Sequence, residues 1–264
     1  MKLAGHVESL WRYPVKSMRG EELPEAFVGF PGIYGDRFYA FHDAATTRKG
    51  FPYLNAPLQP QMLLYRPKYR HPERVKKPIN LAEAEALEPG VTPLYGSAAD
   101  FALDVETPSG QTFSIDDPLL FRQLTEGLRS RHELSVLRSE RALTDCRPVS
   151  LISLQTLSTL TQEIGVALDK RRFRSNIYLN LVNPTGFGED ELVGKMVRIG
   201  AKTEVAVVGL DPRCKMITLD PDTAEQNPEI MRQVARLHDG NAGVYGAVVV
   251  EGTIRPGDEI VLLD

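Results

Sequence analysis

Residues 204–223 read EVAVVGLDPRCKMITLDPDT, and they combine the clearest strand signal of the chain with one of its two cysteines. The first seven residues are mostly apolar and rich in valine, which predicts a strand. Directly after them, Cys214 stands between Arg213 and Lys215. Neighbouring cations favour the thiolate form of a cysteine, which is both the nucleophile and the metal ligand. The stretch therefore predicts a reactive thiol just beyond the end of a strand.

Similar short apolar or alternating runs lie on both sides of this stretch and predict further strands. In the second half they are residues 173–182, 196–199, 204–210, 243–251 and 259–263, with a turn at 255–258. In the first half they are residues 7–13, 37–42, 101–106 and 112–115, with a hairpin turn at 108–110. Residues 66–97, rich in proline and charge, predict irregular structure. Many short strands with few helices favour a mainly β fold of the α+β class, built on a barrel.

Three helices are also expected. A leucine at every fourth position from Leu120 to Leu128 predicts the first. Ser153 is a suitable cap for a second, which has leucines along one face. Asn227 is a suitable cap for the third, because Pro228 fits the first helical position.

The composition is that of an ordinary globular protein of 264 residues, with 42% hydrophobic and 25% charged residues. A net charge of −4 argues against a general nucleic-acid-binding protein. Two cysteines, with no secretory signal and no run of about 18 apolar residues, favour a cytoplasmic protein without a membrane span. The change from loop-rich to periodic sequence near residue 120 predicts two domains, residues 1–120 and 121–264.

Several short motifs occur together along the chain. They are LWRYPVKS at residues 10–17, GDRF at 35–38, TR at 47–48, RFRSNI at 172–177, RC at 213–214 with DPDT at 220–223, and NAGVYG at 241–246. In this order the motifs resemble the MOSC domain and the N-terminal β-barrel domain found with it. Within that superfamily the chain is most similar to the mitochondrial amidoxime-reducing component and its bacterial relatives. The resemblance implies a MOSC β barrel with a few peripheral helices and a smaller N-terminal β-barrel domain.

The resemblance also implies a molybdopterin-type molybdenum cofactor, with Cys214 as the molybdenum ligand. The residues expected to hold the pterin and its phosphate, or to line the same pocket, are Lys16, Ser17, Arg37, Arg174, Asn176, Arg213 and Tyr245. The implied activity is reduction of N-hydroxylated or N-oxygenated compounds such as amidoximes. Pyridoxal phosphate binding is a further label that the family carries.

This chemistry is physically consistent with the residue types. Thiolate is a suitable ligand for a soft metal site, and a phosphate dianion needs arginine forks or lysine charges. Oxygen removal also consumes protons, and Asp220 and Asp222 are candidate donors because they lie close to Cys214 in sequence. The C-x4-C-x2-C pattern of a ferredoxin domain is absent, so the electrons are expected from a separate electron-transfer protein or reductase.

Other interpretations remain open at this point. Cys214 as a persulfide would make the protein a carrier of sulfur or of the cofactor. A β protein that binds an acidic metabolite through Arg37 and Arg174 is a third possibility. Cys146 stands where the family usually has a small hydroxyl residue, and a structural or incidental role is favoured for it. The sequence has no H-E-x-x-H, Walker, dinucleotide-binding or G-x-S-x-G motif.

Overall fold

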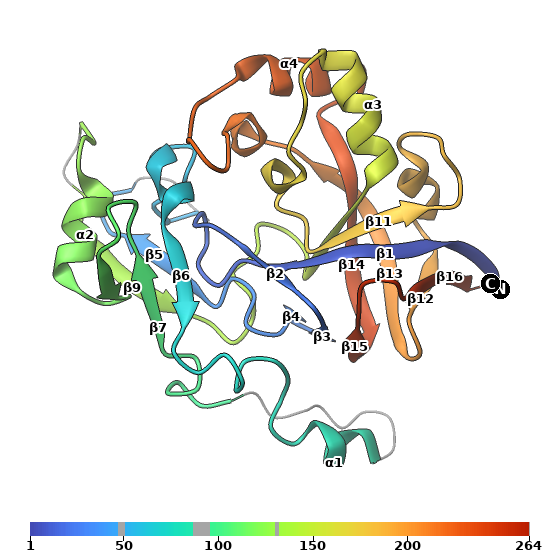
Figure 1. Ribbon diagram of the computed structural model, residues 1–264, viewed down its shortest axis with the longest axis horizontal. Coiled ribbons are helices and arrows are strands. Elements are labelled where there is room, and N and C mark those ends of the chain that lie inside the picture. Colours follow the sequence, from blue (N-terminus) through green and yellow to red (C-terminus); the bar gives the residue numbers. More distant parts are fainter. Residues whose placement is uncertain (47–50, 87–95, 130–131, 264) are drawn as a thin grey trace.

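The computed structural model describes residues 1–46, 51–86, 96–129 and 132–263. Its largest feature is a closed barrel of seven strands (Figure 1). In barrel order the strands are β11 (Ile177–Leu181), β10 (Val149–Ser153), β14 (Asn241–Val250), β13 (Thr203–Pro212), β12 (Met196–Ile199), β16 (Glu259–Leu263) and β1 (Lys2–Arg12). The pairing of β1 with β11 closes the ring, which leaves no free strand edge within it. The mainly β, barrel-based fold class is therefore confirmed.

The interior of the barrel is aliphatic. Along β13, buried Thr203, Val205 and Val207 alternate with less buried residues, as expected when one face of a strand points to a core. Leu10, Ile177 and other aliphatic side chains from several strands join Val205 and Val207 in one cluster. Burying each such side chain contributes about 1.5–3 kcal/mol, so this cluster holds the barrel together.

Three smaller sheets lie beside the barrel, and most of their strands come from the first half of the chain. The first contains β3 (Ala26–Gly29), β4 (Gly32–Ile33) and β15 (Gly252–Ile254), and the second β5 (Tyr39–Asp43) and β9 (Leu134–Arg138). The third contains β6 (Arg66–Tyr69), β7 (Leu103–Glu106) and β8 (Thr112–Ser114), while β2 (Glu21–Leu23) pairs with β1 at the edge of the barrel sheet. Because β1 lies in the barrel, residues 2–12 share it with strands from residues 149–263. The division of the chain at residue 120 stays a prediction.

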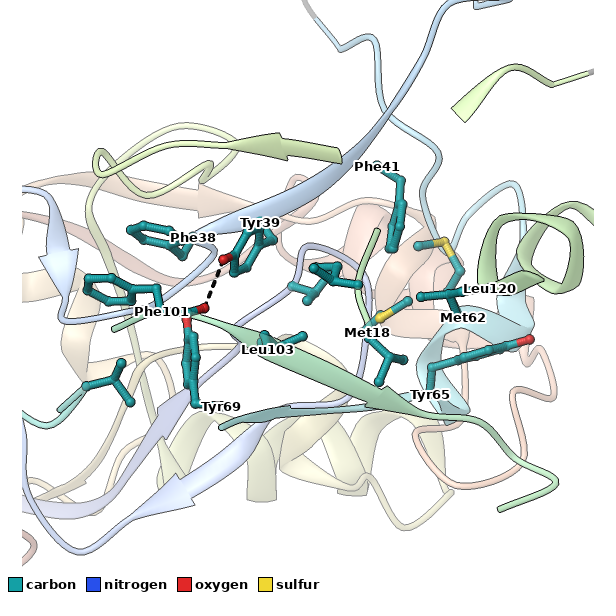
Figure 2. Packing of buried hydrophobic residues seen from close by; sticks show 14 of the residues in the cluster. Met18, Phe38, Tyr39, Phe41, Met62, Tyr65, Tyr69, Phe101, Leu103 and Leu120 are labelled. Atoms are coloured by element: carbon teal, nitrogen blue, oxygen red, sulfur yellow. Dashed lines mark hydrogen bonds between the residues drawn. The ribbon is translucent and has the colours of Figure 1, made fainter. Parts of the chain in front are cut away.

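An aromatic core fills the space between these sheets (Figure 2). The rings of Phe38 and Phe101 stack with centroids 4.1 Å apart. The hydroxyl of Tyr39 donates to the carbonyl of Phe101 over 2.8 Å, which satisfies a buried polar group within this core. This packing fixes the chain segments on either side of Tyr39, which supply part of the site described below.

The helices are α1 (Leu81–Ala86), α2 (Pro118–Thr125), α3 (Leu154–Ile164) and α4 (Pro228–Leu237), together with the 3-10 helices η1 (Pro60–Leu64), η2 (Lys170–Phe173), η3 (Gly188–Leu192) and η4 (Lys215–Thr218). The predicted caps are confirmed: Ser153 accepts from the Thr156 amide and Asn227 from the Glu229 amide. Helices α3 and α4 lie together at one end of the barrel (Figure 1). None of the helices described is long and apolar enough to cross a membrane.

Two sequence predictions need correction. The strand expected at 173–182 begins only at Ile177, because residues 170–173 form η2 and Arg174 has a left-handed backbone with φ of 53°. The region 66–97, expected to be irregular, begins with strand β6. The motif at residues 47–48 lies outside the described residues.

Candidate functional site

A cavity of about 980 Å³ lies where the end of β13 meets segments from the first half of the chain. The structure brings to its wall Cys214 and all seven residues predicted to bind the cofactor. These are Lys16, Ser17, Arg37, Arg174, Asn176, Arg213 and Tyr245. They come from segments far apart in sequence, so the fold alone gathers them.

Cys214 lies at the point where β13 has ended and η4 begins. Its residue surface is exposed, and its carbonyl accepts from the Ile217 amide over 3.2 Å. On its two sides, the Arg213 amide donates to Gly240 O over 2.7 Å, and Lys215 Nζ donates to Pro57 O over 2.9 Å. The backbone around the cysteine is therefore held from both sides, while the thiol is left accessible.

Arg213 is used mainly to hold this turn in place. Its Nε donates to Ala242 O over 2.6 Å, and its Nη1 donates to Phe173 O over 2.8 Å. Its Nη2 lies 2.8 Å from a carboxylate oxygen of Asp211. Because the protein itself supplies these partners, Arg213 positions the cysteine segment and contributes positive charge to the cavity.

Asp211 is a buried carboxylate on the cavity wall that the sequence analysis did not single out. It accepts from Ser150 Oγ over 2.6 Å and forms a hydrogen bond with the Tyr245 hydroxyl. Burial raises the pKa of Asp211, and the charge of Arg213 opposes this rise. Burial and the neighbouring Asp211 raise the pKa of Tyr245.

Three residues on the cavity wall have left-handed backbones that side-chain-bearing residues rarely adopt. The φ angles are 69° at Ser17, 44° at Arg37 and 53° at Arg174. Such residues each cost about 1–3 kcal/mol and persist only where the surroundings enforce them, often at binding sites. Their occurrence together indicates that the backbone strain at this wall is tolerated because it directs the three side chains.

Arg37 and Arg174 lie against the ring of Tyr13, with guanidinium carbons 4.7 Å and 4.2 Å from its centroid. Arg37 pairs with Asp36 and donates from Nη2 to Arg174 O over 2.9 Å. Arg174 donates from Nη1 to Met18 O over 2.7 Å, whereas its Nη2 is buried and without a hydrogen-bond partner. Burial lowers the pKa of Arg174 to about 10, and Arg37 adds to this by repulsion. An anion in the cavity would relieve this unpaired charge.

Lys16 is held at the cavity by Leu143 O, 2.8 Å from its Nζ, and by the carboxylate of Asp145. Burial lowers the pKa of Lys16, while Asp145 acts in the opposite direction. Asn176 is also fixed, because its Nδ2 donates to Trp11 O over 3.2 Å. Both side chains are therefore preorganised on the wall.

Asp220 and Asp222 are not among the residues that line this cavity. Asp220 accepts from Arg172 Nη2 over 2.7 Å, and Asp222 pairs with Arg19 and Arg171. The turn of η4 between Cys214 and these aspartates directs them elsewhere. Their assignment as proton donors stays a prediction.

Cys146 also lines the cavity and is exposed, as is Cys214. An apolar part of the wall comes from Phe51, Leu58 and Met216. Phe51 and Leu58 belong to a segment without a motif, and Met216 lies between the motifs at 213–214 and 220–223, so no sequence signal pointed to these three residues. For Cys146 the sequence did give a signal, because the resemblance predicts a small hydroxyl residue at position 146.

Comparisons with known proteins find two family matches along the chain. Residues 138–261 match the family described as MOSC domain, and residues 4–109 match the MOSC N-terminal beta barrel domain. The chain is 32% identical over 126 residues to a molybdenum cofactor sulfurase of Drosophila persimilis. That match covers 47% of this chain and only 14% of the sulfurase.

Other similarities extend over nearly the whole chain. The mitochondrial amidoxime reducing component 2 of Macaca fascicularis is 24% identical, with 98% of this chain and 84% of that protein covered. The crystal structure of the YUAD protein from Bacillus subtilis aligns with 98% of this chain and 96% of its own, at 13% identity and a TM-score of 0.48.

Proposed function

The chain belongs to the MOSC proteins that also carry the MOSC N-terminal beta barrel domain, and from this we propose that it is a molybdenum-cofactor-dependent reductase of N-hydroxylated or N-oxygenated compounds. One observation carries the proposal. The exposed Cys214 shares a cavity of about 980 Å³ with Ser17, Arg37 and Arg174, whose strained backbones direct polar and cationic side chains along its wall. The amidoxime reducing component among the relatives supports the choice of reaction.

The residues present fit such a cofactor. Cys214 offers a thiolate, the type of ligand that soft metal sites prefer. Arg174 Nη2 is a buried donor without a partner, and a cofactor phosphate would supply the missing acceptor. Lys16 adds a second cation nearby, although Asp145 already pairs with it.

When bound, the cofactor would supply two-electron oxygen-atom transfer. Cys214 would hold its metal, Arg174 and Lys16 would hold its phosphate, and Arg213 would keep the cysteine segment in position. The reaction consumes two protons, and two sources are proposed. Asp220 and Asp222 are the donors suggested by sequence proximity, and Asp211 is the one suggested by its place on the cavity wall.

A separate electron-transfer protein or reductase would supply the electrons, and a small N-hydroxylated compound would be the substrate. The apolar wall at Phe51 and Leu58 leaves room for the rest of such a substrate. The cytoplasmic location expected from the sequence is part of the same proposal. Pyridoxal phosphate binding stays a prediction from the family label.

A second function is favoured by two observations. A relative that matches half of this chain is a molybdenum cofactor sulfurase, and Cys146 lies on the same cavity wall as Cys214. We propose as the alternative that Cys214 carries sulfur as a persulfide, or that the protein carries the cofactor.

The decisive experiment expresses the protein in a host that makes the molybdenum cofactor and measures bound molybdenum by elemental analysis. Reduction of benzamidoxime to benzamidine with a chemical reductant then follows. We expect bound molybdenum and benzamidoxime reduction in the unaltered protein. In Cys214→Ala we expect turnover to fall to background, because the metal ligand is lost.

The matched control is Cys146→Ser, which removes the other exposed thiol and is expected to keep bound molybdenum and turnover. Full molybdenum and full turnover in Cys214→Ala would contradict the role of Cys214. A persulfide on Cys214 in the mass spectrum, without bound molybdenum, would favour the carrier instead.

A further inference from the structure

A second and much smaller pocket, of about 20 Å³, shares Arg174 and Met216 with the large cavity. A cavity needs roughly 10–15 Å³ of this kind of volume to hold one water molecule. The pocket is therefore large enough for one water or one single-atom ion. Its wall contains apolar rings and aliphatic side chains as well as four arginines, namely Arg19, Arg171, Arg172 and Arg174.

Three of these arginines have a buried nitrogen without a hydrogen-bond partner. The atoms are Arg19 Nε, Arg172 Nε and Arg174 Nη2. Each guanidinium is otherwise engaged, since Arg19 Nη2 donates to Pro221 O over 2.9 Å and Arg172 Nη1 donates to Thr218 O over 3.2 Å. Leaving a buried donor unsatisfied costs about 1–3 kcal/mol, and more for a charged group. Three residues that line one pocket therefore each carry a buried donor that an acceptor in the pocket would satisfy.

The charges around the pocket do not balance. The four arginines have three carboxylate partners, Asp169, Asp220 and Asp222. Among the described residues Arg174 has no ion-pair partner, and it is only 9% exposed. One monovalent anion would neutralise this excess.

A water molecule would fit this pocket less well than an anion. Water needs acceptors for its own two hydrogens, whereas the unpartnered side-chain atoms that the described part of the chain places here are all donors. An anion only accepts, so it satisfies the three donors without adding unsatisfied hydrogens. A phosphate or sulfate, with five heavy atoms, exceeds the volume available.

We propose that this pocket binds one chloride-like anion between Arg19, Arg172 and Arg174. In this arrangement Asp220 holds Arg172 and Asp222 holds Arg19 beside the anion. The site shares Arg174 with the proposed cofactor site, and in protein without cofactor the anion would be the acceptor for Arg174 Nη2.

The direct test is a crystal grown or soaked in sodium bromide, with anomalous diffraction measured at the bromine edge. We expect one strong peak between Arg19 Nε, Arg172 Nε and Arg174 Nη2. A peak elsewhere only, or ordinary density that fits a water with no anomalous signal, would overturn the proposal. This measurement uses the unaltered protein and does not depend on whether a variant folds.

A solution test uses the melting midpoint at constant ionic strength, with chloride replacing the larger gluconate anion. We expect a saturable rise of roughly 2–4 °C in chloride, because a ligand that binds only the folded state stabilises it. In Arg19→Lys and Arg172→Lys the positive charge is kept but the Nε donor is lost. We expect the chloride concentration needed for half of the effect to rise at least about tenfold in both, the equivalent of one lost hydrogen bond to a charged group.

The control is Arg70→Lys, because Arg70 lies outside the pocket and its Nε is already satisfied by Asp104 at 3.0 Å. We expect this variant to respond to chloride as the unaltered protein does. Equal midpoints in chloride and gluconate, or an unchanged response in both pocket variants, would contradict the site.

Discussion

The acidic residues on the two sides of Cys214 have opposite environments. Asp211, before the cysteine, is 2% exposed and lines the large cavity with Ser150 and Tyr245. Asp222, after it, has a side chain that is 52% exposed and pairs with Arg19 and Arg171. Burial raises the pKa of Asp211, whereas a hydrogen bond from Arg171 lowers the pKa of Asp222.

This comparison separates distance along the chain from distance in space. The chain turns at η4, directly after the cysteine, so that the later aspartates face the arginines of the small pocket. Asp211 instead occupies a buried position near the end of β13, where the strand delivers it to the cavity. The two positions should therefore respond differently to the same substitution.

Stability should show the largest difference. Asp211→Ala removes the shared acceptor of Ser150, Tyr245 and Arg213, and each buried donor left unsatisfied costs about 1–3 kcal/mol. Asp222→Ala breaks only an exposed pair, so its cost should be at most about 1 kcal/mol. Urea unfolding of both variants measures the two free energies, with Asp104→Ala, which breaks a partly exposed pair with Arg70, as a control. Equal losses at both positions would remove the contrast.

Turnover should show the next largest difference, provided that the proposed reductase activity is found. Asp211→Asn keeps the shape of the side chain but cannot hold a proton, so we expect turnover per bound molybdenum to fall at least about tenfold. Asp220→Asn and Asp222→Asn should stay within about twofold, because both lie away from the cavity. The measurement is benzamidoxime reduction at a temperature where every variant is folded.

The opposite result would favour the prediction made from sequence proximity. A large loss in Asp220→Asn or Asp222→Asn, with Asp211→Asn unaffected, would make the later aspartates the proton donors. The pH profile of turnover distinguishes proton transfer from a structural effect, since only the former moves its acidic or basic limb.

Local signals in the sequence were enough for much of the fold. Strands β12 and β16 have the predicted bounds, and the caps at Ser153 and Asn227 are in place. Strand β10 is not among the predicted strands, because all five of its residues are buried and the usual alternation is absent. The closure of the barrel by β1 was not predicted either, since it joins residues 5–10 to residues 177–181, far apart along the chain.

The site was less accessible to local reasoning. The resemblance supplied its residues, and the structure gathers them in one cavity, but no spacing along the chain indicates that Lys16 and Cys214 line the same cavity. Asp211 was overlooked because its burial depends on the fold, in which β14 pairs beside β13. Asp220 and Asp222 were predicted from sequence proximity to Cys214, and this cannot show that they do not line the cavity.

The smallest effect concerns the acid side of the stability curve. Because the folded-state pKa of Asp222 lies below its ordinary value of 3.8, its ion pairs stabilise the protein above that value, and this contribution is lost as the pH falls through the lowered pKa. The difference in unfolding free energy between the unaltered protein and Asp222→Asn should therefore shrink from at most about 1 kcal/mol at pH 6 toward zero near pH 2. Asp211 has a raised pKa, so its own ionisation should lower stability as the pH rises above 3.8, which is the opposite sign.

Urea unfolding between these pH values, in gluconate salts so that no halide binds, measures both trends. Since added salt screens exposed charges more than buried ones, the Asp222 difference should also decrease with ionic strength while the Asp211 difference persists. Trends of the same sign at both positions would mean that the two aspartates share one environment after all.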